Sequence, residues 1–334
     1  MRKYLNYGSI ILLMVVIVLS GCAVSRYPGD SRTDPGVPPT DPGTPPQVPI
    51  SMTMLPVPGA ASFPTGVNDS GVGSVANPYL MAETEVTYEQ WYTIYTWAIG
   101  NGYTFANKGS EGSDGISGAA PTTSRLQPVV RISWRDAMLW CNALTEYYNA
   151  LHQTSYDCVY YTDAVYAMPI KTSTNDTSVN SSSGSEDNPF VKPNATGFRL
   201  PTGVEWELAA RYIDDTTYYP GNFVSGADAP YNVTATSDYD GNGFIFSTAD
   251  VAIWSDPATS TVVVKSKSPN ALGLYDMSGN VWEWCFDWKA TNTTRVVTGG
   301  SYRSLDTMLR IGNSTGLSPW MFDNHHGFRP VRSE

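Results

Sequence analysis

The chain has 334 residues and a formal net charge of -11, with 20 basic side chains against 31 acidic ones. A chain this acidic repels phosphate backbones, so a nucleic-acid partner is disfavoured. Hydrophobic residues make up 41% of it, enough for a core, whereas 29 glycines, 24 prolines and only 15% charged residues argue against a helical bundle or coiled coil.

The N-terminus has the features of a bacterial signal peptide. Arg2 and Lys3 precede a ten-residue apolar run, 10–19, which is too short to cross a bilayer core of roughly 30 Å as a helix. The run ends in Leu-Ser-Gly-Cys22, which resembles the lipobox of bacterial lipoproteins, whose cysteine carries the lipid. We expect residues 1–21 to be cleaved and Cys22 to anchor the protein in the cell envelope, exposed at the surface of the outer membrane. A plain signal peptide cut nearby is the alternative.

Residues 22–49 are expected to form a linker. Eight of the 24 prolines fall within 28–49, which includes a tandem repeat, Thr-Asp-Pro-Gly-Val-Pro-Pro followed by Thr-Asp-Pro-Gly-Thr-Pro-Pro. Proline-rich sequence favours an extended chain of about 3.1 Å per residue, so this segment could span roughly 70 Å. A semi-rigid stalk and a disordered spacer both fit this composition.

Residues 50–334 are predicted to form one folded domain with three helices. Thr87 and Thr202 each begin a capping box, with Gln or Glu three residues later, and apolar side chains recur at helical spacing after each. Ser133 precedes an acidic first turn and a third helix. Strongly alternating strands are scarce, and residues 171–197, rich in Thr, Ser and Asn, are expected to be a mobile surface insertion that tolerates change.

The mature chain would keep three cysteines, Cys141, Cys158 and Cys285, an odd number that leaves at least one thiol free. Cys141 and Cys285 lie among large apolar residues and are expected to be buried thiols. The sequence has no CxxC motif and only three histidines, so a metal site of thiolates and imidazoles is not expected.

Five ordered motifs resemble the formylglycine-generating-enzyme, or sulfatase-modifying factor, family. They are Glu83–Thr87, Val130–Ala137, Gly197–Arg211, Asn270–Cys285 and the pair Gly-Gly-Ser301 and Gly-Phe-Arg329. The resemblance covers about residues 51–332. It implies an α+β fold of the irregular C-type-lectin-like kind, with little regular secondary structure.

The resemblance fails where the family's oxidases do their chemistry. Those enzymes bind copper and a substrate thiol through a cysteine pair between the Gly-Gly-Ser and Gly-Phe-Arg motifs, and residues 302–326 contain no cysteine. Without a thiolate there is neither a soft metal ligand nor that nucleophile, so we expect no catalytic residue, no catalytic cofactor and no enzyme activity of this kind. Met308, Met321 and the paired histidines could hold copper in principle, but their spacing does not demand it. A Ser-His-Asp arrangement using Asp323 and His325 is formally possible.

The combination of a lipobox with this domain resembles a narrower group, the variable proteins of diversity-generating retroelements, and the treponemal variable lipoproteins in particular. That resemblance implies that the segment 299–329 is variable and that its side chains bind an unknown ligand, either protein or glycan. A preset backbone loses little conformational entropy on binding, which improves affinity. The ligand-binding residues expected are Tyr302, Arg303, Leu305, Asp306, Met308, Thr315, Leu317, Trp320, Phe322, Asp323, Asn324, His325 and His326.

Large apolar side chains in an exposed loop reduce solubility unless they are used for contact. We therefore expect Trp320, Phe322 and His326 to be accessible, although the two aromatic rings could instead pack under the loop. Three other tryptophans should be buried: Trp206, Trp282 and Trp284. Two alternative functions remain, an enzyme with chemistry other than thiol oxidation and a structural envelope lipoprotein without a specific ligand.

By the same family resemblance, the motif Tyr-Asp-Met-Ser-Gly-Asn-Val-Trp-Glu suggests a structural calcium site. Asp276 and Glu283 would supply carboxylates, and Gly279 and Val281 would supply carbonyls. The alternative is that Asp276 caps a turn and Glu283 pairs with an arginine.

Overall fold

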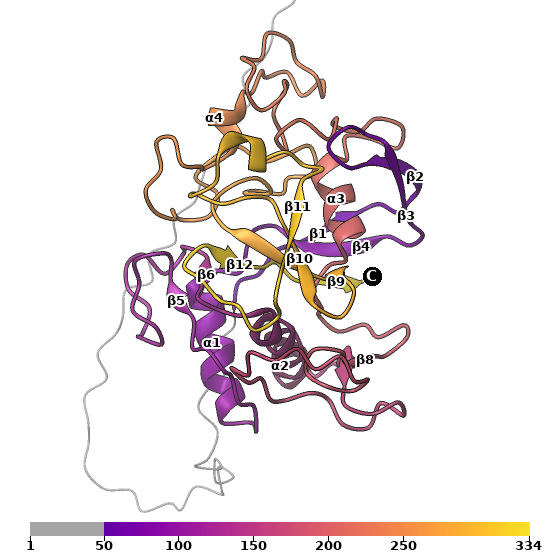
Figure 1. The fold of residues 1–334 in the computed structure, drawn as a ribbon, viewed down its shortest axis with the longest axis vertical. Coiled ribbons are helices and arrows are strands. Elements are labelled where there is room, and N and C mark those ends of the chain that lie inside the picture. Colours follow the sequence, from indigo (N-terminus) through magenta and orange to yellow (C-terminus); the bar gives the residue numbers. More distant parts are fainter. Residues whose placement is uncertain (1–49) are drawn as a thin grey trace, which may run out of the picture. The chain divides into compact units, whose positions relative to one another are not determined.

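The computed structural model describes residues 50–334, so the expected signal peptide, Cys22 and the linker lie outside the described residues. Within the part that is described, no helix combines the length and the apolar character that a membrane span requires. Short strands and long connections surround a few helices (Figure 1), and the α+β class predicted from the sequence is confirmed.

All three predicted helices are present and begin at the expected caps. In each, the side-chain oxygen of Thr87, Ser133 or Thr202 accepts a hydrogen bond from the backbone N–H of the third helical residue. The side chain of that third residue, a glutamine, aspartate or glutamate, accepts one from the backbone N–H of the cap. The helices are α1 (Tyr88–Ile99), α2 (Trp134–His152) and α3 (Gly203–Arg211), followed by the short α4 (Thr248–Val251) and the 3-10 helix η1 (Asp306–Met308).

Two small sheets bring the C-terminal part of the chain into the centre of the domain (Figure 1). The first joins β1 (Met54–Val57), β4 (Tyr79–Ala82) and β13 (Val331–Ser333) in antiparallel order. The second has the order β11 (Ser314–Leu317), β10 (Thr294–Thr298), β9 (Trp282–Ala290) and β12 (His326–Gly327), with β12 parallel to β9.

Three further strand pairs are short hairpins or isolated ladders. The pairs are β2 (Ala60–Thr65) with β3 (Gly71–Val75), β5 (Ser110–Glu111) with β6 (Val129–Val130), and β7 (Tyr160–Tyr161) with β8 (Phe190–Val191). Four of these six strands have only two residues, which is too short for a period-2 pattern to show in the sequence.

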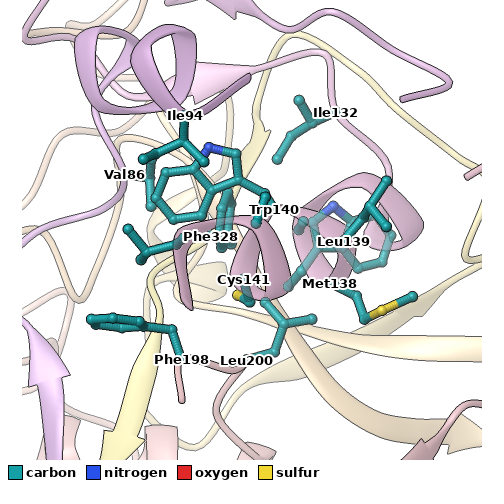
Figure 2. Close-up of a cluster of buried hydrophobic side chains, with 14 of the residues drawn as sticks. Val86, Ile94, Ile132, Met138, Leu139, Trp140, Cys141, Phe198, Leu200 and Phe328 are labelled. Carbon is teal, nitrogen blue, oxygen red and sulfur yellow. The ribbon is translucent and has the colours of Figure 1, made fainter. Parts of the chain in front are cut away.

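The largest hydrophobic cluster lies between α1, α2 and β9 and includes Phe328 from the Gly-Phe-Arg motif (Figure 2). The Trp140 ring stacks on Trp91 with centroids 6.2 Å apart, and Phe328 meets Trp140 edge-on at 5.4 Å. Aromatic pairs in these geometries stabilise a core beyond the area they bury. The last motif of the chain is therefore fixed by its packing against the two long helices.

Two smaller clusters hold the middle of the candidate variable segment. Ile311 packs with Trp206 and Cys285 in one cluster, and Leu309 packs with Val224 and Val251 in the other. Both side chains are almost fully buried. The segment 299–329 is therefore partly framework, with core residues placed between exposed ones.

Residues 171–197 lie largely at the surface, as predicted, but a buried arginine of α2, Arg135, holds them to the domain. Asp187 is fully buried and forms an ion pair with Arg135 of α2, with Oδ1 2.6 Å from Nε. The same guanidinium donates to the backbone carbonyls of Thr174, Asp176 and Ser178. This pairing argues against tolerance to change at Asp187, because its loss would leave the buried Arg135 with Glu186, 3.4 Å away, as its remaining carboxylate partner among the described residues.

Candidate functional site

The candidate binding segment begins at a backbone that its neighbours hold in place. Gly299 and Gly300 have φ values of +89° and +78°, which favour glycine, and an added Cβ at Gly300 would lie 3.1 Å from the Met308 carbonyl oxygen. The Gly299 carbonyl accepts a hydrogen bond from Gly279 N at 2.9 Å. This fixes the point at which the segment leaves β10.

Asn280 links this start to two other loops. Its backbone carbonyl accepts a hydrogen bond from Tyr302 N, and its backbone N–H donates one to the Ile253 carbonyl, both at 2.9 Å. Its side chain accepts from Val262 N and donates to the carboxylate of the buried Glu85. The backbone and side chain of this one buried residue therefore fix the position of the 253–262 loop relative to the start of the candidate segment.

The end of the segment is also held by hydrogen bonds. The His325 carbonyl accepts from Trp282 N at 2.8 Å, and β12 then pairs with β9. Arg329 is fully buried and donates to both carboxylate oxygens of Glu283, at 2.7 to 3.0 Å. Between two fixed ends, the exposed side chains of residues 303–325 are free of the contacts that hold the backbone at either junction, whereas Leu309 and Ile311 belong to the core.

Most of the predicted ligand-binding side chains reach the surface. Leu305 is 67% exposed, Phe322 49% and Met308 42%, whereas Trp320 is half-buried. The expectation of accessibility is thus confirmed for Phe322 and met only in part for Trp320. Three more of these side chains are exposed: Arg303, Thr315 and Asp323. Four others are half-buried: Asp306, Leu317, Asn324 and His325.

Two of the predicted contact residues lie below this surface instead. Tyr302 is 3% exposed and His326 is 5% exposed, so the expectation that His326 is accessible is wrong. The His326 ring lies beside Trp284, with centroids 5.8 Å apart, because pairing of β12 with β9 turns it inward. Burial, together with the neighbouring His325, lowers the pKa of His326 to about 3. Burial of the other three tryptophans is confirmed: Trp206, Trp282 and Trp284.

A hollow opens beside the start of the segment, with a volume of about 510 Å³. Arg303 and Asn324 line it from the candidate segment, and the Arg303 Nη1 donates to Asn324 Oδ1 at 3.3 Å. The lining residues from elsewhere in the sequence are Asp114, Ser255, Ala258 and Thr259. No sequence motif marks these four, and only the fold brings them to the segment.

Of the residues expected to bind calcium, Glu283 is already paired with a buried arginine, Arg329. The Glu283 carboxylate accepts from Arg329 and from Trp206 Nε1 at 2.8 Å, which is the arginine pairing held as the alternative. Asp276 is buried and accepts from Lys265 N at 2.9 Å, and burial raises its pKa to about 6. A calcium ion would have to compete with Arg329 for Glu283, so these donors do not fit an ion in this arrangement.

One group of three carboxylates among the described residues has oxygens within 4.8 Å of one another: Asp228, Asp238 and Asp240. The run Asp238-Tyr-Asp-Gly-Asn-Gly243 has the spacing of calcium-binding loops, a signal that the sequence analysis overlooked. In the structure, backbone N–H groups of Tyr239 and Phe246 satisfy Asp228, and those of Gly241 and Gly243 satisfy Asp238. The carboxylates are thus held in place by the loop's own amides.

The described cysteines are unsuited to thiol chemistry. Cys141, Cys158 and Cys285 are all buried and free, which confirms the expectation for Cys141 and Cys285. Burial raises the pKa of each thiol, that of Cys158 to about 12. A thiol that stays protonated is neither a nucleophile nor a metal ligand.

The Ser-His-Asp arrangement that Asp323 and His325 could have formed is not assembled. The Asp323 carboxylate lies 3.6 Å from His325 Nδ1, and no serine among the described residues hydrogen-bonds to that ring. Asn324 is the side chain that His325 Nδ1 contacts, at 3.3 Å. A nucleophilic serine is therefore missing from the geometry.

A family model described as a sulfatase-modifying factor enzyme 1-like domain matches residues 59–334. A chaperone protein, LppX of Paenibacillus barcinonensis, is 30% identical over 226 residues, which are 62% of this chain and 70% of that protein. The formylglycine-generating enzyme of Thermomonospora curvata is 33% identical over 156 residues, 40% of this chain, so the match spans about half (48%) of that enzyme.

Among solved structures, Treponema denticola variable protein 1 superimposes with a TM-score of 0.59 at 26% sequence identity. The match covers 85% of this chain and 96% of that one. The similarity therefore extends over almost the whole of the described domain, including the candidate segment.

Proposed function

The chain belongs to the family of sulfatase-modifying factor enzyme 1-like domains, and from that membership we propose that it is a ligand-binding member without thiol oxidase activity. In this proposal Cys22 carries the lipid anchor, the linker lifts the domain off the outer membrane, and the face formed by exposed side chains of residues 303–325 binds the ligand. A retroelement diversifies the codons of this segment.

The observation that carries the proposal is the exposure of large apolar side chains on a segment whose backbone is fixed. Leu305, Met308 and Phe322 are each more than 40% exposed, although Leu309 and Ile311 between them are core residues. Exposed apolar groups on a soluble domain mark interaction sites when they gather in one region. Aromatic and arginine side chains, here Phe322 and Arg303, are the types that dominate binding energy at interfaces.

The absence of a usable thiol favours binding over the family's oxidation chemistry. The segment 302–326 has no cysteine, and the three cysteines that the structure describes are buried with raised pKa values. Similarity to a variable protein of a treponeme, at 26% identity over nearly its full length, supports the binding alternative. Fold alone would not decide between them, because one fold hosts many functions.

The experiment compares three forms of the full chain on one array of immobilised proteins and glycans. The first is unaltered, and the second carries Leu305→Ser, Met308→Ser and Phe322→Ser. The third carries Val165→Ser and Met168→Ser, which remove exposed apolar groups from the loop that follows β7. We expect the face variant to lose every specific signal and the control to keep it. Equal signals from both variants, or no signal from the unaltered chain, would contradict the proposal.

Diversification has its own test in the flanking DNA. The proposal requires a reverse-transcriptase gene and a near-copy of the codons for residues 300–329 in which the mismatches coincide with adenines. A locus with neither would leave a binding protein of fixed sequence and remove the retroelement from the account.

A further inference from the structure

The hollow beside Arg303 differs in character from the apolar side chains around it. Its lining has one guanidinium, one amide, one carboxylate and two hydroxyl groups, from Arg303, Asn324, Asp114, Ser255 and Thr259. Its remaining lining residues among those described are Ala258 and Tyr302, and Tyr302 is only 3% exposed. This lining is mainly polar and offers hydrogen-bond donors and acceptors.

Arg303 has an uncommitted positive charge. It is exposed, and within residues 50–334 it forms no ion pair; its one side-chain hydrogen bond goes to the Asn324 amide oxygen. Arg125, which is about half exposed, already has a carboxylate partner in Glu89 at 3.0 Å. In a chain of net charge -11, a free guanidinium next to an amide is a position where a ligand carboxylate gains charge-assisted hydrogen bonds.

The other wall of the hollow favours hydroxyl groups. The Asp114 carboxylate accepts from hydroxyl donors, and the exposed Ser255 and Thr259 hydroxyls both donate and accept. This wall is fixed relative to Arg303, because Ser255 N donates to the Ser304 carbonyl at 3.1 Å and Asn280 holds both the 253–262 loop and Tyr302. The hydroxyl-binding wall is thus preorganised against the guanidinium.

We infer that this hollow is a subsite for an acidic saccharide, whose carboxylate contacts Arg303 and Asn324 and whose hydroxyl groups contact Asp114, Ser255 and Thr259. The inference rests on the proposed function and specifies the ligand class at one part of the face. An acidic peptide side chain would pair with Arg303 but would make no hydrogen bonds to Asp114, Ser255 and Thr259, so it would gain fewer contacts in this hollow than an acidic saccharide. Half of this subsite lies outside the segment 299–329 and would stay constant if that segment varied.

The test measures binding of small probes to the full chain by ligand-observed NMR titration. The probes are methyl β-D-glucuronide, methyl β-D-glucoside, which lacks only the carboxylate, and N-acetylglutamate amide, which has a carboxylate without the sugar hydroxyls. We expect the glucuronide to bind at least about tenfold more tightly than either of the others, as charge-assisted bonds and satisfied hydroxyls predict. Arg303→Gln should remove that advantage, and Arg125→Gln, the matched change at a paired arginine, should leave it unchanged.

The failing outcomes are distinct. If the glutamate compound bound more tightly than the glucuronide, the ligand class would be a peptide and not a saccharide. If none of the probes showed saturable binding, or if Arg303→Gln had no larger effect than Arg125→Gln, the hollow would not be a subsite. Each of these leaves the proposed function standing if the triple face variant still abolishes binding on the array. Loss of the array result as well would overturn both.

Discussion

At the scale of single residues, buried titratable groups below the candidate face connect stability to pH. His326 is 5% exposed, its Nδ1 has no hydrogen-bond partner within residues 50–334, and burial lowers its pKa from 6.5 to about 3. The unfolded chain therefore binds a proton below pH 6.5 that the folded chain excludes. This contribution to stability is fully present above pH 6.5 and is lost as the pH falls toward 3.

We predict that the unaltered chain loses about 2 kcal/mol more folding free energy than His326→Gln between pH 7 and pH 5, since each pH unit below the unfolded pKa costs about 1.4 kcal/mol. Urea unfolding at both pH values measures this difference. His152→Gln, a change at an exposed histidine, is the control and should follow the unaltered chain. Parallel pH profiles for His326→Gln and the unaltered chain would refute the assignment.

The three buried thiols give a second prediction at this scale. Because Cys141, Cys158 and Cys285 are inaccessible and their pKa values are raised, iodoacetamide should leave all three unmodified in the native protein at pH 8 and should alkylate all three in urea. Site-resolved mass spectrometry reads each cysteine separately. Rapid native alkylation of any of them would reopen the possibility of thiol chemistry.

At the scale of elements, capping motifs were the part of the fold that the sequence predicted best. Thr87, Ser133 and Thr202 begin α1, α2 and α3 as expected, because a cap and its partner three residues later form a local signal. The strands were not predicted individually. Pairs such as β5 with β6 consist of two residues each and exist only because distant segments meet.

The insertion 171–197 shows the same limit and yields a prediction. Its composition indicated a loop, but composition cannot show that Asp187 reaches Arg135 of α2 inside the protein. Asp187→Asn should destabilise the chain by about 2–3 kcal/mol, because the buried guanidinium of Arg135 loses its short charge-assisted bonds and keeps only Glu186, 3.4 Å away, as a carboxylate partner among the described residues. Asp176→Asn, in the exposed part of the same insertion, should change stability far less, because its carboxylate faces solvent.

Both values come from urea unfolding of the full chain under the same conditions. If Asp187→Asn were as mild as Asp176→Asn, the insertion would behave as the tolerant loop that its composition indicated. The anchor through Arg135 would then contribute little to the fold.

At the scale of the whole molecule, the sequence motifs predicted the family and the fold, and they placed the candidate segment between the correct anchors. They could not show which side chains of that segment face outward. His326 and Phe322 are four residues apart in the same segment, yet strand pairing turns the first inward, whereas the second is 49% exposed. Nor could they show that Asp114 and Ser255 join Arg303, since that contact depends on three separate loops meeting.

The central claim is that the segment 299–329 combines a fixed framework with a face whose side chains are interchangeable. Stability separates these two roles. Ile311 is 1% exposed in the core, and its truncation leaves a cavity, whereas Leu305, Met308 and Phe322 contribute mainly to the surface.

The most direct measurement is the free energy of unfolding of two variants of the full chain. We predict that Leu305→Ser, Met308→Ser and Phe322→Ser together cost about 1 kcal/mol or less. Ile311→Ala alone should cost about 2–5 kcal/mol. If the triple variant lost as much stability as Ile311→Ala, the exposed side chains would be holding the fold together, and the account of an interchangeable binding face would be contradicted.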